Sequence, residues 1–232
     1  MIKDIIFPPR CPICEAIVSK LGMACDTCKD NLPYIKEPRC KRCSKPIGNE
    51  ETENCCDCMR KEFHYTSGKA VWIYNKTMSQ SIGRFKYQNK QEYAVFYGEE
   101  ISRLYGSWIK DNQIEALIPV PIHKRKKSLR GYNQAELIAH VISDNLEIPL
   151  LRTGLERFKE TKPQKDLTLS ERMRNMEAAF TSGKSQIGVF RRVALIDDIY
   201  TTGSTMEACA KELLKLGVDE VYFLCVCIGT SV

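Results

Sequence analysis

A chain of 232 residues with 43% hydrophobic residues can form one medium domain and one small domain. Its formal net charge of +6 permits phosphate or nucleic-acid ligands without requiring them. The sequence contains no apolar run of about 18 residues that would predict a membrane span. Because the first ten residues also lack a signal-peptide pattern, we expect a cytoplasmic protein.

Nine of the twelve cysteines precede residue 60, and eight of them form Cys-x-x-Cys pairs. The pairs are Cys11/Cys14, Cys25/Cys28, Cys40/Cys43 and Cys55/Cys58. Two such pairs complete a tetrahedral site for structural zinc, and a cytosolic setting favours metal over disulfides. Residues 1–60 therefore predict a double zinc ribbon with two closed sites. Sequential pairing is favoured over a crossed one, and the alternative interpretation is a redox-active loop.

Residues 61–232 predict a second domain in which strands and helices alternate. The expected strands are 68–74, 116–122, a short one at 148–151, 192–196 and 221–228; the expected helices are 77–88, 91–108, 133–145 and 203–216. A polar, basic stretch at 156–175 predicts a long loop running into a helix. This order predicts an α/β fold, a parallel sheet with helices on both faces.

The strongest functional signal is the segment 193–205, in which an apolar strand leads into two carboxylates and a hydroxyl-rich turn. Its polar residues are Asp197, Asp198, Thr201, Thr202, Gly203, Ser204 and Thr205. Free amides at the start of the next helix favour an anion, and the carboxylates suit sugar hydroxyls or Mg²⁺. Taken singly, Asp198 is compatible with a turn acid and Ser204 with a helix cap.

Segment 193–205 resembles the motif with which type I phosphoribosyltransferases bind phosphoribosyl pyrophosphate (PRPP). Further segments resemble the ComF family of bacterial competence proteins, as do the cysteine pairs. These segments are FKY (85–87), IPVPIHKRKKSLRGYNQAELIA (118–139) and TKPQKDLTLSERMRNMEAAF (161–180). The resemblance covers nearly the whole chain. It implies a parallel-sheet type I phosphoribosyltransferase fold behind a small N-terminal zinc-ribbon module, divided into residues 1–60 and 61–232.

The resemblance also implies the roles of individual residues in binding PRPP with Mg²⁺. Asp197 and Asp198 would hold the ribose hydroxyls, and residues 201–205 would surround the 5-phosphate. The loop after strand 116–122 would bind pyrophosphate through His123, Lys124 and Arg125. A mobile loop would close over the site with Lys162, Gln164, Arg172 and Arg174.

Two basic runs are candidates for contacts to single-stranded DNA. We expect the main contributors in the first run, Lys36, Arg39, Lys41, Arg42 and Lys45, and a share of the contacts in the second, from Lys124 to Arg130. Tyr34, Phe63 and Tyr65 could stack on bases near the first run. The alternative interpretation of either run is a solvated face.

Two functions remain open. The first is the handling of single-stranded DNA in natural competence, with PRPP or a related sugar phosphate as ligand and a competence-machinery partner such as a helicase. The second is an active phosphoribosyltransferase with an unknown acceptor. Thr201 stands where hypoxanthine/guanine-type transferases carry an acid that serves as a base, and Ile2 where PRPP amidotransferases need cysteine. Both departures favour the first function.

Overall fold

The computed structural model describes residues 8–157, 180–183 and 187–230. Its centre is a sheet of four strands: β1 (Ser67–Ile73), β6 (Glu220–Ile228), β5 (Arg192–Tyr200) and β2 (Ala116–Pro119), in this spatial order. All three strand pairings are parallel. The α/β fold with a parallel sheet, predicted from the alternation of strands and helices, is therefore confirmed.

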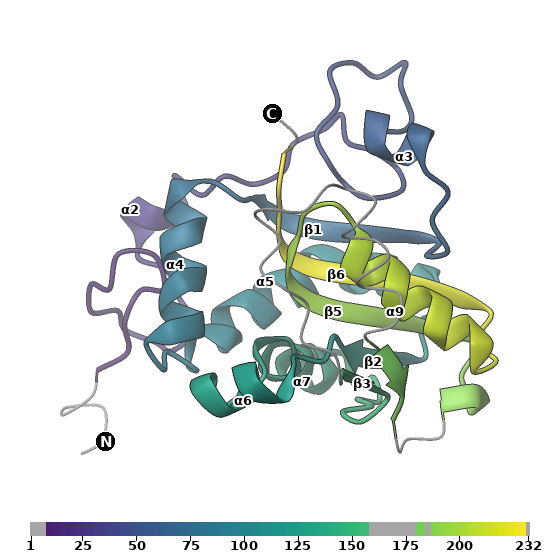
Figure 1. The fold of residues 1–232 in the computed structure, drawn as a ribbon. Helices are drawn as coiled ribbons and strands as arrows, with labels where there is room; N and C mark the ends of the chain where they lie inside the picture. The colour runs from purple at the N-terminus through teal and green to yellow at the C-terminus, as the bar shows by residue number, and fades with distance from the viewer. Residues whose placement is uncertain (1–7, 158–179, 184–186, 231–232) are drawn as a thin grey trace.

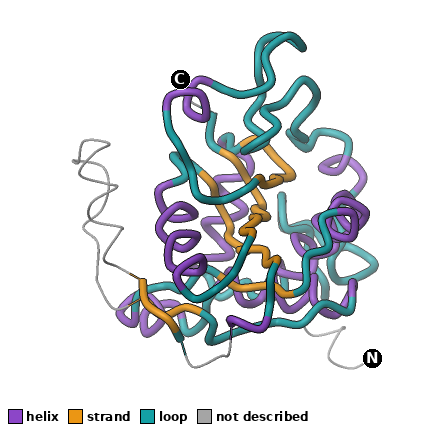
Figure 2. The backbone as a smooth tube through the Cα atoms, turned by 90° about the vertical axis from the view of Figure 1, so that its right-hand side faces the viewer, coloured by secondary structure: helices purple, strands orange, loops and turns teal. Residues whose placement is uncertain are grey.

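Helices cover both faces of this sheet (Figures 1 and 2). On one face lie α4 (Lys76–Tyr87), α5 (Tyr93–Asp111) and α7 (Gln134–Leu146), and on the other lies α9 (Ser204–Lys215). Side chains along β5 alternate between the two cores, with Val193 facing α9 and Ala194 facing the other helices. Burial on both faces explains why these strands have continuous apolar sequences.

The smaller elements are α2 (Asp26–Lys29), α3 (Cys56–Arg60), α6 (Lys124–Arg130), the antiparallel pair β3 (Leu155–Arg157) and β4 (Phe180–Ser182), and the 3-10 turn η2 (Ile187–Val189). The described helices include none with the combination of length and apolar character that crossing a bilayer requires.

Several expected elements differ from the structure; the strand 116–122, for example, ends at Pro119. The strand 148–151 is reduced to a single bridge between Leu150 and Leu117. β5 continues past the predicted end at residue 196 because it stays paired with β6 as far as Tyr200. The expected pyrophosphate loop is only partly a loop: His123 caps α6 with its ring, while Lys124 and Arg125 form the first turn of this helix.

The cysteine-rich segment lies on both faces of the sheet. The first ribbon, residues 8–28, packs beside α4 and α5, and Cys11 belongs to the core on that face. The second ribbon, residues 40–58, packs on the opposite face, where Cys40 and Cys43 share a core with α9. In Figure 1, α2 of the first ribbon lies beside α4, whereas α3 of the second lies at the far end of β1.

The segment between the ribbons, together with the start of the second ribbon, covers the outer edge of β1. Ile35 donates its main-chain N–H to Val71, and Ile73 donates in return to Pro33. Gly68 of β1 donates to the carbonyl oxygen of Arg42 in the same way. These bonds satisfy backbone groups that an edge strand would otherwise present to solvent.

Candidate functional site

The eight paired cysteines form two groups of four, as sequential pairing predicts. The groups are Cys11, Cys14, Cys25 and Cys28, and Cys40, Cys43, Cys55 and Cys58; in each, the Sγ atoms lie within 4.8 Å of one another. The Sγ atoms of Cys14 and Cys25 are 3.6 Å apart, as are those of Cys43 and Cys55. Thiolates at about 2.3 Å from a tetrahedral zinc ion are about 3.8 Å apart, so both groups fit zinc. Four thiolates leave no position for a catalytic water, which makes the sites structural.

The two groups differ in depth. In the second group Cys40 and Cys43 are fully buried and Cys58 is 7% exposed, whereas Cys14 of the first group is exposed. Cys56 is also exposed and belongs to neither group, so Cys55 is the ligand candidate, as expected from its spacing. The second cysteine group is therefore part of the hydrophobic core that it shares with α9.

The two carboxylates of the candidate ligand site lie near the end of β5, beside a lysine from α4. Lys86 Nζ donates to Asp198 Oδ1 at 2.7 Å, and the main-chain N–H of Asp198 donates to Asp197 Oδ1 at 2.8 Å. Burial alone would lower the pKa of Lys86, but the attraction of Asp198 and Asp197 outweighs burial and raises it. Burial and the charge of Asp198 raise the pKa of Asp197 to about 7.

The turn after β5 leads directly into α9. Gly203 has φ +78° and precedes Ser204, the first residue of the helix. The hydroxyls of Thr202 and Ser204 lie 2.9 Å apart, and the turn lines a small hollow together with Asp197. The unpaired amides of the first helical turn, the helix dipole and these hydroxyls all favour an anion here.

A basic pocket adjoins the carboxylates on the side of Lys86. Its volume is about 430 Å³, and it is lined by Lys86, Tyr87, Asn89, Lys126, Leu129 and Arg130. The Arg130 guanidinium lies 5.0 Å from the centre of the Tyr87 ring, and it donates to Gln134 at 2.9 Å. Although the side chain of Lys126 is exposed, desolvation by the surrounding protein and the positive charges of Arg157 and Arg130 lower its pKa. Although Lys86 pairs with Asp198, the concentration of three cations around one pocket favours a polyanionic ligand.

The first basic run differs from α6 because most of its charges are paired with acids. Three of its five members pair with acids: Arg39 with Glu37, Lys41 with Glu53, and Lys45 with Asp57. Lys36 is exposed and Arg42 half-buried. Phe63 and Tyr65 are 7% and 1% exposed, so the expectation that they stack on bases is wrong: both rings fill the core beneath the second ribbon.

The N-terminal part of the chain also matches a known domain. Residues 2–59 match the sequence model of the double zinc ribbon domain. Competence protein F of Haemophilus influenzae is 34% identical over 217 residues, which cover 85% of this chain and 93% of that protein. The chain belongs to the ComF family. Competence protein ComFC of Bacillus subtilis is 29% identical, covering 83% of this chain and 78% of its own length. DNA utilization protein YhgH of Escherichia coli K12 is 26% identical, covering 81% and 83%.

Membership of the ComF family and the double zinc ribbon together assign structural zinc to the two cysteine groups. Among the residues expected to bind PRPP, the structure brings Asp197 and Asp198 together with the turn 201–205. The residues expected to close over the ligand, Lys162, Gln164, Arg172 and Arg174, lie outside the described residues.

Sequence reasoning on this ComF-family chain missed the role of Lys86, although FKY was recognised as a family segment. A signal was present, because Lys86 lies four residues after the buried Ile82 and therefore on the same side of α4. A lysine on the apolar side of a helix needs a carboxylate partner. Glu207 was missed as well: this acid in the first turn of α9 is 3% exposed and contacts His64.

Because the pKa of Asp197 is raised, the stability of the folded protein should fall as the pH rises, whereas the binding of a cation to this carboxylate should strengthen. Between about pH 4 and 7 the folded ComF-family protein holds a proton that the unfolded chain releases. The contribution of Asp197 to stability is therefore complete below about pH 4 and is lost as the pH rises through 7. A Mg²⁺ ion held by Asp197, as the sequence predicts, would need the ionised carboxylate, so its binding should instead strengthen over the same interval.

This prediction is measured by melting temperatures of the wild type and Asp197→Asn between pH 5 and 8. The asparagine stays neutral, so the wild type should lose stability relative to this variant as the pH rises. Asp219→Asn, at an exposed ion pair with Arg191, is the control and should show no such divergence. Parallel curves for Asp197→Asn and the wild type would contradict the raised pKa.

Proposed function

We propose that this ComF-family protein binds PRPP, or a related sugar phosphate, together with Mg²⁺ and handles single-stranded DNA during DNA uptake in the cytoplasm. Of the three relatives described above, two are named competence proteins and one a DNA utilization protein, which supports the DNA-related role. A partner in the competence machinery, such as a helicase, is part of the same proposal.

The proposal of a sugar-phosphate ligand rests on the arrangement of residues at the end of β5. Asp197 and Asp198 lie on the strand, and the amides and hydroxyls of residues 202–205 begin α9 directly after it. Carboxylates can hold ribose hydroxyls or Mg²⁺ while the helix start holds the 5-phosphate. Both binding groups stand within one short segment of chain, which suits a phosphorylated ribose.

The basic surface of α6 supports binding of a nucleic-acid strand. Lys124, Arg125, Lys126 and Lys127 are all exposed on this seven-residue helix. Beside them, Tyr87 is 72% and Leu129 78% exposed, so an aromatic and an aliphatic surface accompany the charge. Proteins generally bind single strands without sequence preference through basic side chains placed along the phosphate backbone of the strand and aromatic rings that stack on its bases.

The test of the sugar-phosphate ligand is thermal stabilisation by PRPP with Mg²⁺. A ligand at about 100 times its Kd stabilises the native state by about 2.7 kcal/mol, so the wild type should melt at a higher temperature. The double variant Asp197→Asn/Asp198→Asn should lose the shift yet keep its zinc, because the zinc centres lie elsewhere. Asp219→Asn should keep the full shift. If PRPP with Mg²⁺ raises the melting temperature of the double variant as much as that of the wild type, these carboxylates do not hold the ligand.

The alternative is an active phosphoribosyltransferase with an unknown acceptor. The observation that favours it is the pocket that α6 cations line together with Lys86, the partner of Asp198. Loss of pyrophosphate from PRPP passes through an oxocarbenium-like state that needs positioning and electrostatic stabilisation. Lys124 and Arg125 suit the charge of the departing pyrophosphate. Release of pyrophosphate in the presence of candidate bases would support this alternative, whereas binding of PRPP without turnover supports the first proposal.

A further inference from the structure

The two zinc ribbons contact two different parts of the candidate ligand site. The second ribbon continues into residues 63–65, which lie against the phosphate-binding turn and the first turn of α9. The first ribbon contacts α4, the helix that carries Lys86 to Asp198. Neither ribbon supplies a residue to the proposed ligand contacts themselves.

The link from the second ribbon centres on Glu207. The main-chain N–H of His64 donates to Glu207 Oε2 at 2.7 Å, and His64 Nδ1 lies 2.6 Å from Glu207 Oε1. Glu207 in turn donates its own main-chain N–H to the carbonyl oxygen of Gly203 at 2.8 Å. The buried carboxylate of Glu207 therefore joins the segment after the second ribbon to α9, and the main-chain N–H of the same residue bonds the carbonyl oxygen of Gly203 in the turn.

The neighbouring residues hold the same turn by close packing. A Cβ placed on Gly203 would lie 2.6 Å from the Tyr200 hydroxyl and 3.2 Å from the Phe63 ring. The hydroxyls of Tyr65 and Tyr200 are 2.7 Å apart, and both side chains are buried. Because there is no spare room around Gly203, a shift of residues 63–65 must displace the turn.

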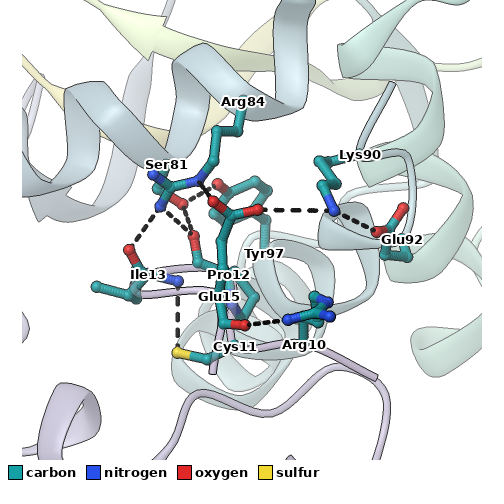
Figure 3. A network of polar contacts seen from close by, with 10 residues as sticks. All are labelled: Arg10, Cys11, Pro12, Ile13, Glu15, Ser81, Arg84, Lys90, Glu92 and Tyr97. Atoms are coloured by element: carbon teal, nitrogen blue, oxygen red, sulfur yellow. Dashed lines mark hydrogen bonds and ion pairs between the residues drawn. The ribbon is translucent and has the colours of Figure 1, made fainter. Parts of the chain in front are cut away.

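The first ribbon holds α4 through its main-chain carbonyl groups (Figure 3). Ser81 Oγ donates to the Pro12 oxygen at 2.6 Å, and Arg84 donates to the Ile13 oxygen at 2.5 Å. Lys86 follows Arg84 by two residues on the same helix. The position of the first ribbon thus helps to fix the end of α4 from which Lys86 reaches Asp198.

We propose that the zinc ribbons position the ligand site from both faces of the sheet, with Glu207 as the positioning residue that couples the second ribbon to the phosphate-binding turn. The proposal rests on the proposed sugar-phosphate function and adds a role for zinc in ligand affinity. Allosteric coupling between two sites commonly changes an affinity about 5-fold to 150-fold, and we expect an effect in this range.

The test compares three carboxylate variants for PRPP affinity with Mg²⁺, zinc content and melting temperature. Glu207→Ala removes both bonds to His64 and should weaken PRPP binding at least about fivefold while both zinc ions stay bound. Glu207→Gln keeps an acceptor for the His64 N–H and should restore most of the affinity. Glu100→Ala is the matched control: this buried acid of α5 bonds Tyr34 between the ribbons but lies on the other face of the sheet.

Glu100→Ala should lower the melting temperature and leave the affinity for PRPP unchanged. If Glu207→Ala does not fold, His64→Ala serves instead, since its half-exposed ring can be removed without opening the core, and a smaller loss of affinity is expected. Wild-type affinity in the folded Glu207 or His64 variant would overturn the coupling and leave the proposed function intact. Absence of PRPP binding by the wild type would overturn both.

Discussion

Replacing Cys43 by serine is expected to release one of two zinc ions per chain and to lower the melting temperature by about 10 °C or more. Cys43 is fully buried in the core shared with α9, so loss of its metal leaves a polar hydroxyl and three unpaired thiols inside the molecule. Apparent binding free energies of structural zinc, about 10–16 kcal/mol in small peptides, show how much a site can contribute to folding.

Cys14→Ser should also release one zinc ion, but with a smaller fall in melting temperature, because Cys14 is exposed. The first ribbon should then unfold while the sheet domain remains folded. Cys56→Ser is the matched control, since this exposed cysteine belongs to neither group and should change neither zinc content nor melting temperature. Elemental analysis and scanning calorimetry measure both quantities. Protein purified without chelators that contains no zinc would refute the metal centres.

Charge reversal on α6 is expected to weaken binding of single-stranded DNA about tenfold to a hundredfold at low salt, because affinity for a single strand depends on phosphate contacts. The variant is Lys126→Glu/Lys127→Glu, at two exposed positions of a helix with five basic residues. Each phosphate contact that is lost should also reduce the slope of log affinity against log salt by about 0.7. Filter binding at several salt concentrations measures both effects.

The matched comparison is Lys41→Glu/Arg42→Glu in the first basic run. Lys41 already pairs with Glu53, and its neighbours Arg39 and Lys45 pair with acids, so this reversal should weaken binding less than the one on α6. If neither double variant weakens binding, or if the wild type has no affinity for single strands at low salt, the DNA-handling proposal fails. The phosphoribosyltransferase alternative would then take its place.

The parts of the molecule that follow from local pattern were predictable. The cysteine spacing predicted two metal groups, because a two-residue spacer turns two thiolates to one ion. It left open which pairs share an ion, and the favoured sequential pairing is the one that the structure shows. The apolar runs predicted the sheet, since strands buried on both faces carry mainly apolar residues. The turn 201–205 was found because a strand, two acids and a helix start follow one another directly in the chain.

The parts that depend on distant contacts were not predictable. The length of β5 is set by its pairing with β6, and the partner of Lys86 lies 112 residues away. The basic run at 124–130 gives no apolar periodicity, so its helix could not be told from a loop. Likewise, the sequence does not indicate that the two ribbons lie on opposite faces of the sheet, because this depends on the path of residues 33–42 along β1.

The path of residues 33–42 has a consequence for the protein without metal. This segment connects the two zinc ribbons, and its bonds to Val71, Ile73 and Gly68 occupy the free side of β1. If both ribbons unfold, the segment loses its anchors, and a strand with the apolar sequence AVWI at 70–73 is left open to pairing with another chain. Zinc starvation would then cause self-association through β1, a path to aggregation from which the bound metal protects the folded protein.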